Sequence, residues 1–210
     1  MKGSTQDFLE ISQIREGLLV LKNRTLRGVL MVSSINFALK SREEQDAIVF
    51  QFQDFLNSLD FSTQVVIQSR RLNITGYLDQ LKELEKGQKN ELLKNQIASY
   101  YDFIKQFVEA GNIMSKEFFV VLPYSPAELY GVPAPQRALK AVGAMTEEDF
   151  QRAKVQLWQR MEFVVLGLKR MGLQAVPLST VELTELFWRL HHPSQAEKGY
   201  YPEIPPELTL

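Results

Sequence analysis

Cysteine is absent from the sequence, and histidine occurs only twice among its 210 residues. The first absence excludes disulfide bonds and thiolate metal sites, and it fits a reducing compartment. With only two histidines, the chain has few side chains that could bind a metal ion or form a Ser-His-Asp triad. His191 and His192 are adjacent, and neighbouring residues of a helix point about 100° apart, so they are poorly placed to hold one ion. We expect them to cap a helix end instead.

The motifs of common enzymes are also lacking. No segment fits the phosphate-binding loop G-x-x-x-x-G-K-[ST], in which glycines let backbone N–H groups surround the phosphates. No G-x-S-x-G nucleophile elbow occurs. Gly17, Gly28 and Gly111 are isolated, and turns or close packing explain them. We therefore expect no catalytic residue, no cofactor and no bound metal, and hence no enzyme in this chain.

Net charge and long apolar runs are missing as well. Lys and Arg number 24 against 25 Asp and Glu, which gives no global field that would steer nucleic acid or anionic lipid to the surface. No apolar run approaches the roughly 20 residues that span a bilayer, and the polar start of the chain is unlike a secretory signal. The expected location is the cytoplasm, either free or peripheral at the inner face of the cytoplasmic membrane, without direct membrane insertion.

Apolar residues are abundant enough for a sizeable core. The chain is 45% hydrophobic and 10% aromatic, which suits a folded domain of this length. We expect one domain over residues 17–192, preceded by a polar lead-in at 1–16. Residues 193–210 are rich in proline and are expected to form an extended tether.

Apolar patterning predicts an α/β (α+β) fold in which helices pack on a mixed sheet of about five strands. The runs 17–22 and 26–37 flank Asn23-Arg24-Thr25, where Asn23 tolerates a left-handed backbone, so a hairpin is expected. Both faces of the second run are apolar, which indicates a central strand. Further strands are expected at 62–70, 117–122 and 173–177, and the main helices at 42–59, 75–111, 147–171 and 180–191.

Helix-start signals support these boundaries. Ser41 with Glu44, and Ser179 with Glu182, have the spacing of capping boxes, and Thr146 precedes three acidic residues. The stretch 82–91 is almost wholly polar, so it either projects into solvent or breaks into two helices near its glycine. Either outcome makes 82–91 an exposed arm.

Two aromatic features allow more than one interpretation. Trp158 and Trp188 lie on apolar helical faces, which favours core positions over ligand-stacking platforms. The run 116–120 resembles the aromatic strand of RNA-recognition modules, yet it lacks the glycine that follows the basic residue there, so core packing is favoured.

Candidate contact surfaces lie in segments expected to be exposed. Besides the polar arm, they are the proline-rich segment 123–145, with Leu129 and Tyr130, and the tail, with Tyr200 and Tyr201. Two alternatives remain open. Arg24, Arg27, Arg70 and Arg71 would form a basic strip in a nucleic-acid-binding module, and an enzyme would need an unrecognised site within 123–145.

Four passages carry a family resemblance. They are LRGVLMVSSINFALKSREEQ (26–45), NSLDFSTQVVIQSRRLNITGYL (57–78), MSKEFFVVLPY (114–124) and GLQAVPLSTVELTELFWRLHHP (172–193), with SSINFALKS, QSRRLNI and LSTVEL as markers. Together they resemble the N-terminal domain of TraC-like conjugative-transfer ATPases of type IV secretion systems, over most of residues 10–193.

The resemblance implies a non-catalytic role. In that family a motor domain with nucleotide-binding motifs follows, and the N-terminal domain docks the motor onto inner-membrane channel subunits and neighbouring copies. This chain stops where the motor would begin, so the resemblance implies no ATPase activity and carries over no catalytic residue. The expected partners are inner-membrane secretion-channel proteins, a motor ATPase, or further copies of the chain in a membrane-associated complex.

Overall fold

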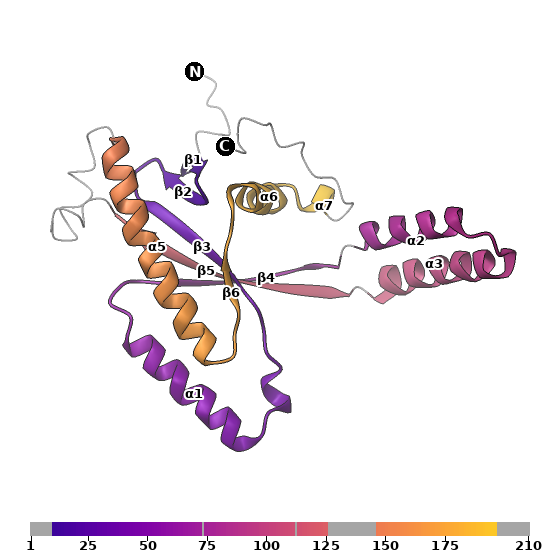
Figure 1. Cartoon of the computed structure of the whole chain (residues 1–210), viewed down its shortest axis with the longest axis horizontal. Coiled ribbons are helices and arrows are strands. Elements are labelled where there is room, and N and C mark those ends of the chain that lie inside the picture. Colours follow the sequence, from indigo (N-terminus) through magenta and orange to yellow (C-terminus); the bar gives the residue numbers. More distant parts are fainter. Residues whose placement is uncertain (1–9, 73, 112, 126–145, 197–210) are drawn as a thin grey trace. The chain divides into compact units, whose positions relative to one another are not determined.

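The computed structural model of the chain describes residues 10–72, 74–111, 113–125 and 146–196 (Figure 1). Its strands are β1 (Ile11–Arg15), β2 (Leu18–Leu21), β3 (Leu26–Val32), β4 (Gln64–Arg71), β5 (Met114–Tyr124) and β6 (Ala175–Pro177). Its helices are α1 (Arg42–Asn57), α2 (Thr75–Gly87), α3 (Glu91–Gly111), α5 (Glu147–Arg170), α6 (Thr180–His191) and α7 (Pro193–Ala196), with a 3₁₀ turn at Phe37–Leu39.

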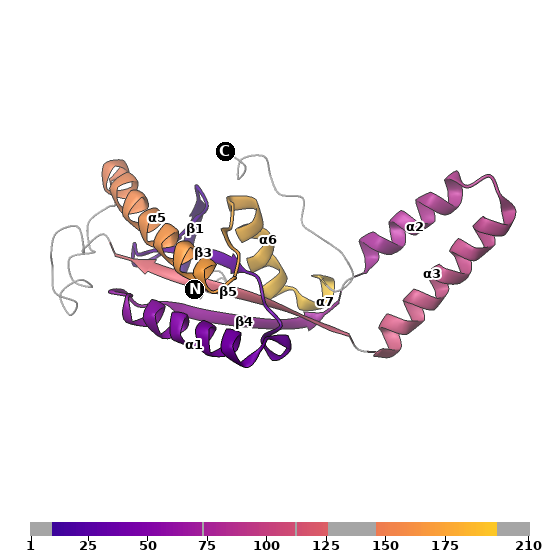
Figure 2. The same cartoon turned by 60° about the horizontal axis from the view of Figure 1, so that its bottom comes forward.

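The chain forms two compact units. Of the described residues, 10–67, 117–125 and 146–184 belong to the first, which we call the sheet unit. The second, which we call the hairpin unit, contains 68–72, 74–111, 113–116 and 185–196. Helices α2 and α3 lie side by side in it as an antiparallel pair (Figures 1 and 2).

The sheet has the order β1-β2-β3-β5-β4, and β6 also pairs with β3. Strand β2 pairs with the start of β3 and β6 with its end, so these two share one edge of β3. Because neighbouring strands are antiparallel, β3 and β4 run parallel with β5 between them, and β5 and β6 run parallel with β3 between them. Helices α1 and α5 make these two crossovers, which gives the β-α-β-β-α-β arrangement of ferredoxin-like folds.

The main core lies between the sheet and α5. Buried side chains recur along α5 at helical spacing, at Phe150, Ala153, Leu157, Met161, Val164 and Leu168. They meet the alternate residues of β3 and β5 that face this side, among them Leu26, Leu30 and Leu122, each of them fully buried. Burying one such leucine contributes about 1.5–3 kcal/mol. This seam fixes α5 to the centre of the sheet.

Strand β3 is covered on both faces over most of its length, and Met31 is the exception to the predicted cover. Leu30 is fully buried toward α5, and Val29, which points the other way, is only 3% exposed. Phe119 of β5 is 4% exposed, but Met31 of β3, which pairs with it, is 45% exposed, so the cover on this face does not reach the end of β3. The central position of β3 is therefore confirmed, and within the run 116–120 core packing is confirmed for Phe119 and Val120.

The helix starts are confirmed by their hydrogen bonds. Ser41 Oγ accepts from the backbone N–H of Glu44 at 3.3 Å, and the Glu44 carboxylate accepts from Ser41 N–H at 3.0 Å. Ser179 and Glu182 make the same reciprocal pair at 3.3 and 2.8 Å.

The polar stretch 82–91 breaks into two helices, because α2 ends at Gly87 and α3 begins at Glu91.

Two expectations about the N-terminal strands need correction. Arg24, with φ of 63°, takes the left-handed conformation between β2 and β3 that was predicted for Asn23. The Asn23 carboxamide oxygen instead accepts from Thr25 N–H and Thr25 Oγ1 at 3.0 and 2.7 Å, an Asx-type turn. A sixth strand, β1, pairs with β2 through a turn at Glu16 and Gly17, both with positive φ.

Helix α1 approaches α5 most closely where the Phe55 ring lies against Gly167. A Cβ added at Gly167 of α5 would lie 2.4 and 2.7 Å from ring carbons of Phe55. We predict that Gly167→Ala lowers the free energy of unfolding by about 1–3 kcal/mol, because the rigid ring must move. Gly76→Ala in α2 is the control, since no atom lies within 4 Å of the added Cβ. Chemical denaturation of both variants is the measurement, and equal stabilities would contradict this packing.

Candidate docking groove beside helix α5

Several residues predicted to make contacts lie outside the described residues. These are Leu129, Tyr130, Tyr200 and Tyr201, and their roles stay predictions. No helix in the described ranges combines the length and the apolarity that crossing a membrane requires.

The four arginines of the predicted basic strip are divided between the units. Arg24 and Arg27 belong to the sheet unit, and Arg70 and Arg71 to the hairpin unit. Arg27 is half-buried: its Nη1 donates to the carbonyl oxygen of Leu26 at 2.9 Å, and desolvation by burial lowers its pKa. Arg27 is therefore already engaged with the backbone, and the strip as a whole stays a prediction.

Of the two histidines predicted to cap a helix end, His192 takes that position, and the capping role of His191 stays a prediction. His192 Nδ1 lies 3.1 Å from the carbonyl oxygen of Trp188 at the end of α6. The His192 ring also stacks on the half-buried Trp188 ring, with centroids 5.1 Å apart. Within the described ranges, no cluster of three or more histidine, aspartate or glutamate side chains could hold a metal ion.

An open groove of about 560 Å³ runs along one side of α5, next to β6. Most of its lining is apolar, with three polar side chains at the rim. The apolar residues are Val155, Trp158, Met161, Val165 and Pro177, and the polar ones are Lys154, Gln159 and Glu162. Such a shape with an aromatic side chain in its wall suits an apolar anchor from a partner.

The groove arises because α5 is apolar over a wider arc than the sheet covers. Trp158 adjoins the buried Leu157, yet it keeps 37% of its surface exposed, so the prediction that it lies in the core was wrong. Val155 and Leu166 face further outward and are both 54% exposed. Strand β6 has only three residues, and so it is too short to cover this side of the helix.

Pro177 restricts what the groove can accept. Leu178 N–H donates to the carbonyl oxygen of Val29 at 3.0 Å, so by alternation the backbone of Pro177 faces away from β3. Proline has no N–H, and at an outer edge it blocks the addition of another strand. A partner would therefore fill the groove with side chains, not extend the sheet.

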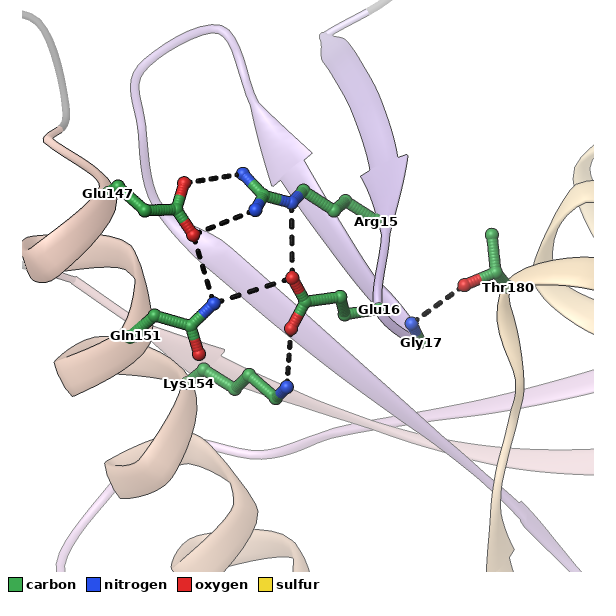
Figure 3. Close-up of polar contacts among 7 residues, drawn as sticks. All are labelled: Arg15, Glu16, Gly17, Glu147, Gln151, Lys154 and Thr180. Atoms are coloured by element: carbon green, nitrogen blue, oxygen red, sulfur yellow. Dashed lines mark hydrogen bonds and ion pairs between the residues drawn. The ribbon is translucent and has the colours of Figure 1, made fainter. Parts of the chain in front are cut away.

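A polar cluster lies between the β1–β2 turn and the start of α5 (Figure 3), and one of its members, Lys154, also lines the groove. The Arg15 guanidinium donates two hydrogen bonds to the Glu147 carboxylate, at 2.9 and 2.8 Å. Glu16 pairs with Lys154, and Gln151 Nε2 donates to Glu147 Oε1 at 3.0 Å. The cluster joins the β1–β2 turn to the first turns of α5, and it neutralises Lys154 at the groove rim.

Two further contacts hold the β1–β2 turn in place. The Arg15 guanidinium lies 4.6 Å from the centroid of the Phe150 ring. Gly17 N–H donates to Thr180 Oγ1 at 2.9 Å (Figure 3). Gly17 has a φ of 73°, and an added Cβ would meet the carbonyl oxygen of Leu178 at 3.2 Å, so this position requires glycine.

The cluster changes the acidity of its members. The hydrogen bond from Lys154 lowers the pKa of Glu16, and the hydrogen bonds from Arg15 lower the pKa of Glu147. The pKa of Arg15 is raised, chiefly by its hydrogen bonds to Glu147. Arg15 and Glu147 are 132 positions apart. Sequence reasoning missed the pair because an acidic residue in the first turn of a helix, such as Glu147, is already explained by the helix dipole. The only signal of this pair in the sequence was the basic residue Arg15 within the polar lead-in.

The lowered pKa of Glu16 predicts a pH-dependent stability. Its folded pKa lies below the ordinary 4.5, so the contribution is complete above pH 4.5 and is lost as the pH falls through the folded value. We expect Glu16→Gln to lower the free energy of unfolding by about 1 kcal/mol at pH 7, and by less at pH 3. Urea denaturation at both pH values measures it, and a pH-independent difference would refute this account.

A second depression of about 190 Å³ lies between α1 and the other side of α5, lined in part by Phe55, Phe163, Leu166 and Gly167. Phe163 is 43% exposed there, and its ring meets Phe61 edge to face at 6.4 Å. On α1 itself no residue is buried. The outer surface formed by α5 and α1 is thus apolar beyond the groove.

Comparison with known proteins places this architecture in a family. None of the curated proteins compared with the chain matches it. The family model for the archaeal TraC-like domain matches residues 11–193, a range that begins at β1 and ends two residues beyond α6. This match bears out the resemblance carried by the four sequence passages, and the chain belongs to the archaeal TraC-like domain family.

Proposed function

We propose that this chain is a non-catalytic docking and assembly domain of a conjugative, type IV secretion machine. Its family supports a role related to conjugation. The groove beside α5 would receive an apolar segment of an inner-membrane channel subunit or of a separate motor ATPase. The observation that carries the proposal is the exposure of Trp158 in that groove.

The energetics of the surface favour a protein partner. Val155 and Trp158, three positions apart on one helix, both expose apolar surface to water in the groove, and exposed apolar patches are typical of interaction sites. Tryptophan is among the residues that contribute most to binding, about 2 kcal/mol or more when it is enclosed by a partner. Burial of this patch would stabilise a complex.

The groove is better suited to binding than to chemistry. Its charged lining consists of Lys154 and Glu162, and Lys154 is paired with Glu16. A catalytic site needs an acid, base or nucleophile with a pKa tuned to the reaction. The lowered pKa of Glu16 serves an ion pair at the rim instead, which supports the non-catalytic assignment.

Site-specific photocrosslinking tests where the partner binds. A benzophenone amino acid is placed at Val155, in the groove, and in a separate chain at Arg152, whose exposed side chain lies on the same helix outside the groove lining. We expect Val155 to crosslink to an inner-membrane subunit or a motor ATPase of the conjugation machine, identified by mass spectrometry, and Arg152 not to do so. Equal crosslinking from both positions, or none, would reject the groove.

Substitution of Trp158 tests its contribution to affinity. Against the purified crosslinked partner, Trp158→Ser should weaken binding at least tenfold, about 1.4 kcal/mol. Phe50→Ser in α1 is the matched control, because Phe50 is 66% exposed and does not line the groove. Isothermal titration calorimetry gives both dissociation constants. The assignment fails if Trp158→Ser binds as tightly as the unsubstituted chain.

A further inference from the structure

The helical hairpin of α2 and α3 carries a second apolar surface besides the one along which its helices pack. Leu81 of α2 is buried, and Leu78, Ile97 and Ile104 are half-buried. These positions recur at helical spacing and form the seam between the two helices. In a hairpin that uses one such seam, the remaining arcs of both helices should be polar.

On one side of this hairpin the exposed side chains are apolar or aromatic. Tyr77 and Leu84 of α2 are 44% and 63% exposed, and Tyr100, Phe103 and Phe107 of α3 are 44%, 60% and 56% exposed. The hydroxyl oxygens of Tyr77 and Tyr100 lie 3.3 Å apart, so both helices contribute to the same side. The Phe103 and Phe107 rings stack with centroids 5.9 Å apart. We call these five side chains the aromatic face.

Glu83 lines a depression together with Leu84 of the aromatic face, and no basic residue is among the residues that line it. Gln96 lies four residues before Tyr100 and Gln80 four before Leu84, so two uncharged amides border the aromatic face. Lys82 lies on another side of the hairpin, where its Nζ is 5.0 Å from the centroid of the Tyr101 ring. An anionic membrane would favour a cationic border. A border with two amides and a single carboxylate instead suits an identical surface, because two copies meet there with little repulsion.

We propose that two copies of this chain associate through their aromatic faces, so that two hairpins form a four-helix bundle. In such a bundle each helix buries two apolar stripes instead of one, which accounts for the second stripe on α2 and α3. This pairing is independent of the groove beside α5.

The size of the face sets the expected strength. A large aromatic side chain buries about 150–250 Å² in full. The five half-exposed side chains would then contribute roughly 500 Å² per copy, or about 1,000 Å² in total, at the lower limit of specific interfaces. We therefore expect a reversible dimer that depends on protein concentration.

Sedimentation equilibrium of the full chain tests the proposal. The unsubstituted chain should reach a dimer mass with increasing concentration, and Phe103→Ser combined with Phe107→Ser should weaken dimerisation at least tenfold. The matched control combines Phe50→Ser and Val155→Ser, which replace equally exposed side chains of the sheet unit and should leave the dimer intact. A monomer at all concentrations, or a dimer lost only in the control variant, would overturn the proposal.

Chemical crosslinking gives a second measurement of dimerisation, and it leaves the five side chains of the aromatic face unchanged. Because the chain has no cysteine, a single introduced thiol reports one position. Gln96→Cys, on the border of the face, should be joined to its copy by a bismaleimide. Asp102→Cys should not, because it adjoins Phe103 about 100° around the helix. Crosslinking at Asp102 alone, or a monomeric chain that sediments with anionic vesicles, would contradict a second copy as the occupant.

Discussion

Met161 of α5 lies against Gly28 of β3, at a position where a Cβ on the strand would come within 2.4 Å of the methionine sulfur. This close approach seats α5 on the central strand, and the rest of the sheet unit follows from it. The buried stripe of α5 is fixed toward β3 and β5, so the apolar positions beside it, such as Trp158, are left where the short β6 cannot cover them. The ion pairs of Arg15 and Glu16 then hold the first turns of α5 to the β1–β2 turn. One helix thus builds the core on one side and the proposed docking groove on another.

The elements of the fold could be predicted where the signals were local. Capping boxes placed the starts of α1 and α6, and apolar runs on both faces identified β3 as central. Strand β1 was missed because Ile11–Arg15 alternates weakly, and its pairing depends on the turn at Glu16 and Gly17. The order of the strands was also beyond local patterns, since β6 pairs with a strand that is more than 140 residues away in the sequence.

The candidate site was harder to predict, because exposure depends on what lies next to a helix, not on the helix itself. Trp158 and Phe103 both occupy apolar helical stripes, and periodicity alone assigns such stripes to a core. The structure leaves both of them partly exposed, in a groove beside α5 and on one side of the hairpin. The pairing of Glu16 with Lys154 was equally hidden, since the two residues are 138 positions apart.

The fluorescence of Trp158 tests the docking account most directly. The chain has two tryptophans, so Trp188→Phe leaves Trp158 as the only indole. On addition of a purified inner-membrane subunit or motor ATPase of the conjugation machine, the account predicts a blue shift of its emission and weaker quenching by acrylamide, because a partner side chain displaces water from the groove. A complex that forms while the emission and quenching of Trp158 stay unchanged would contradict it.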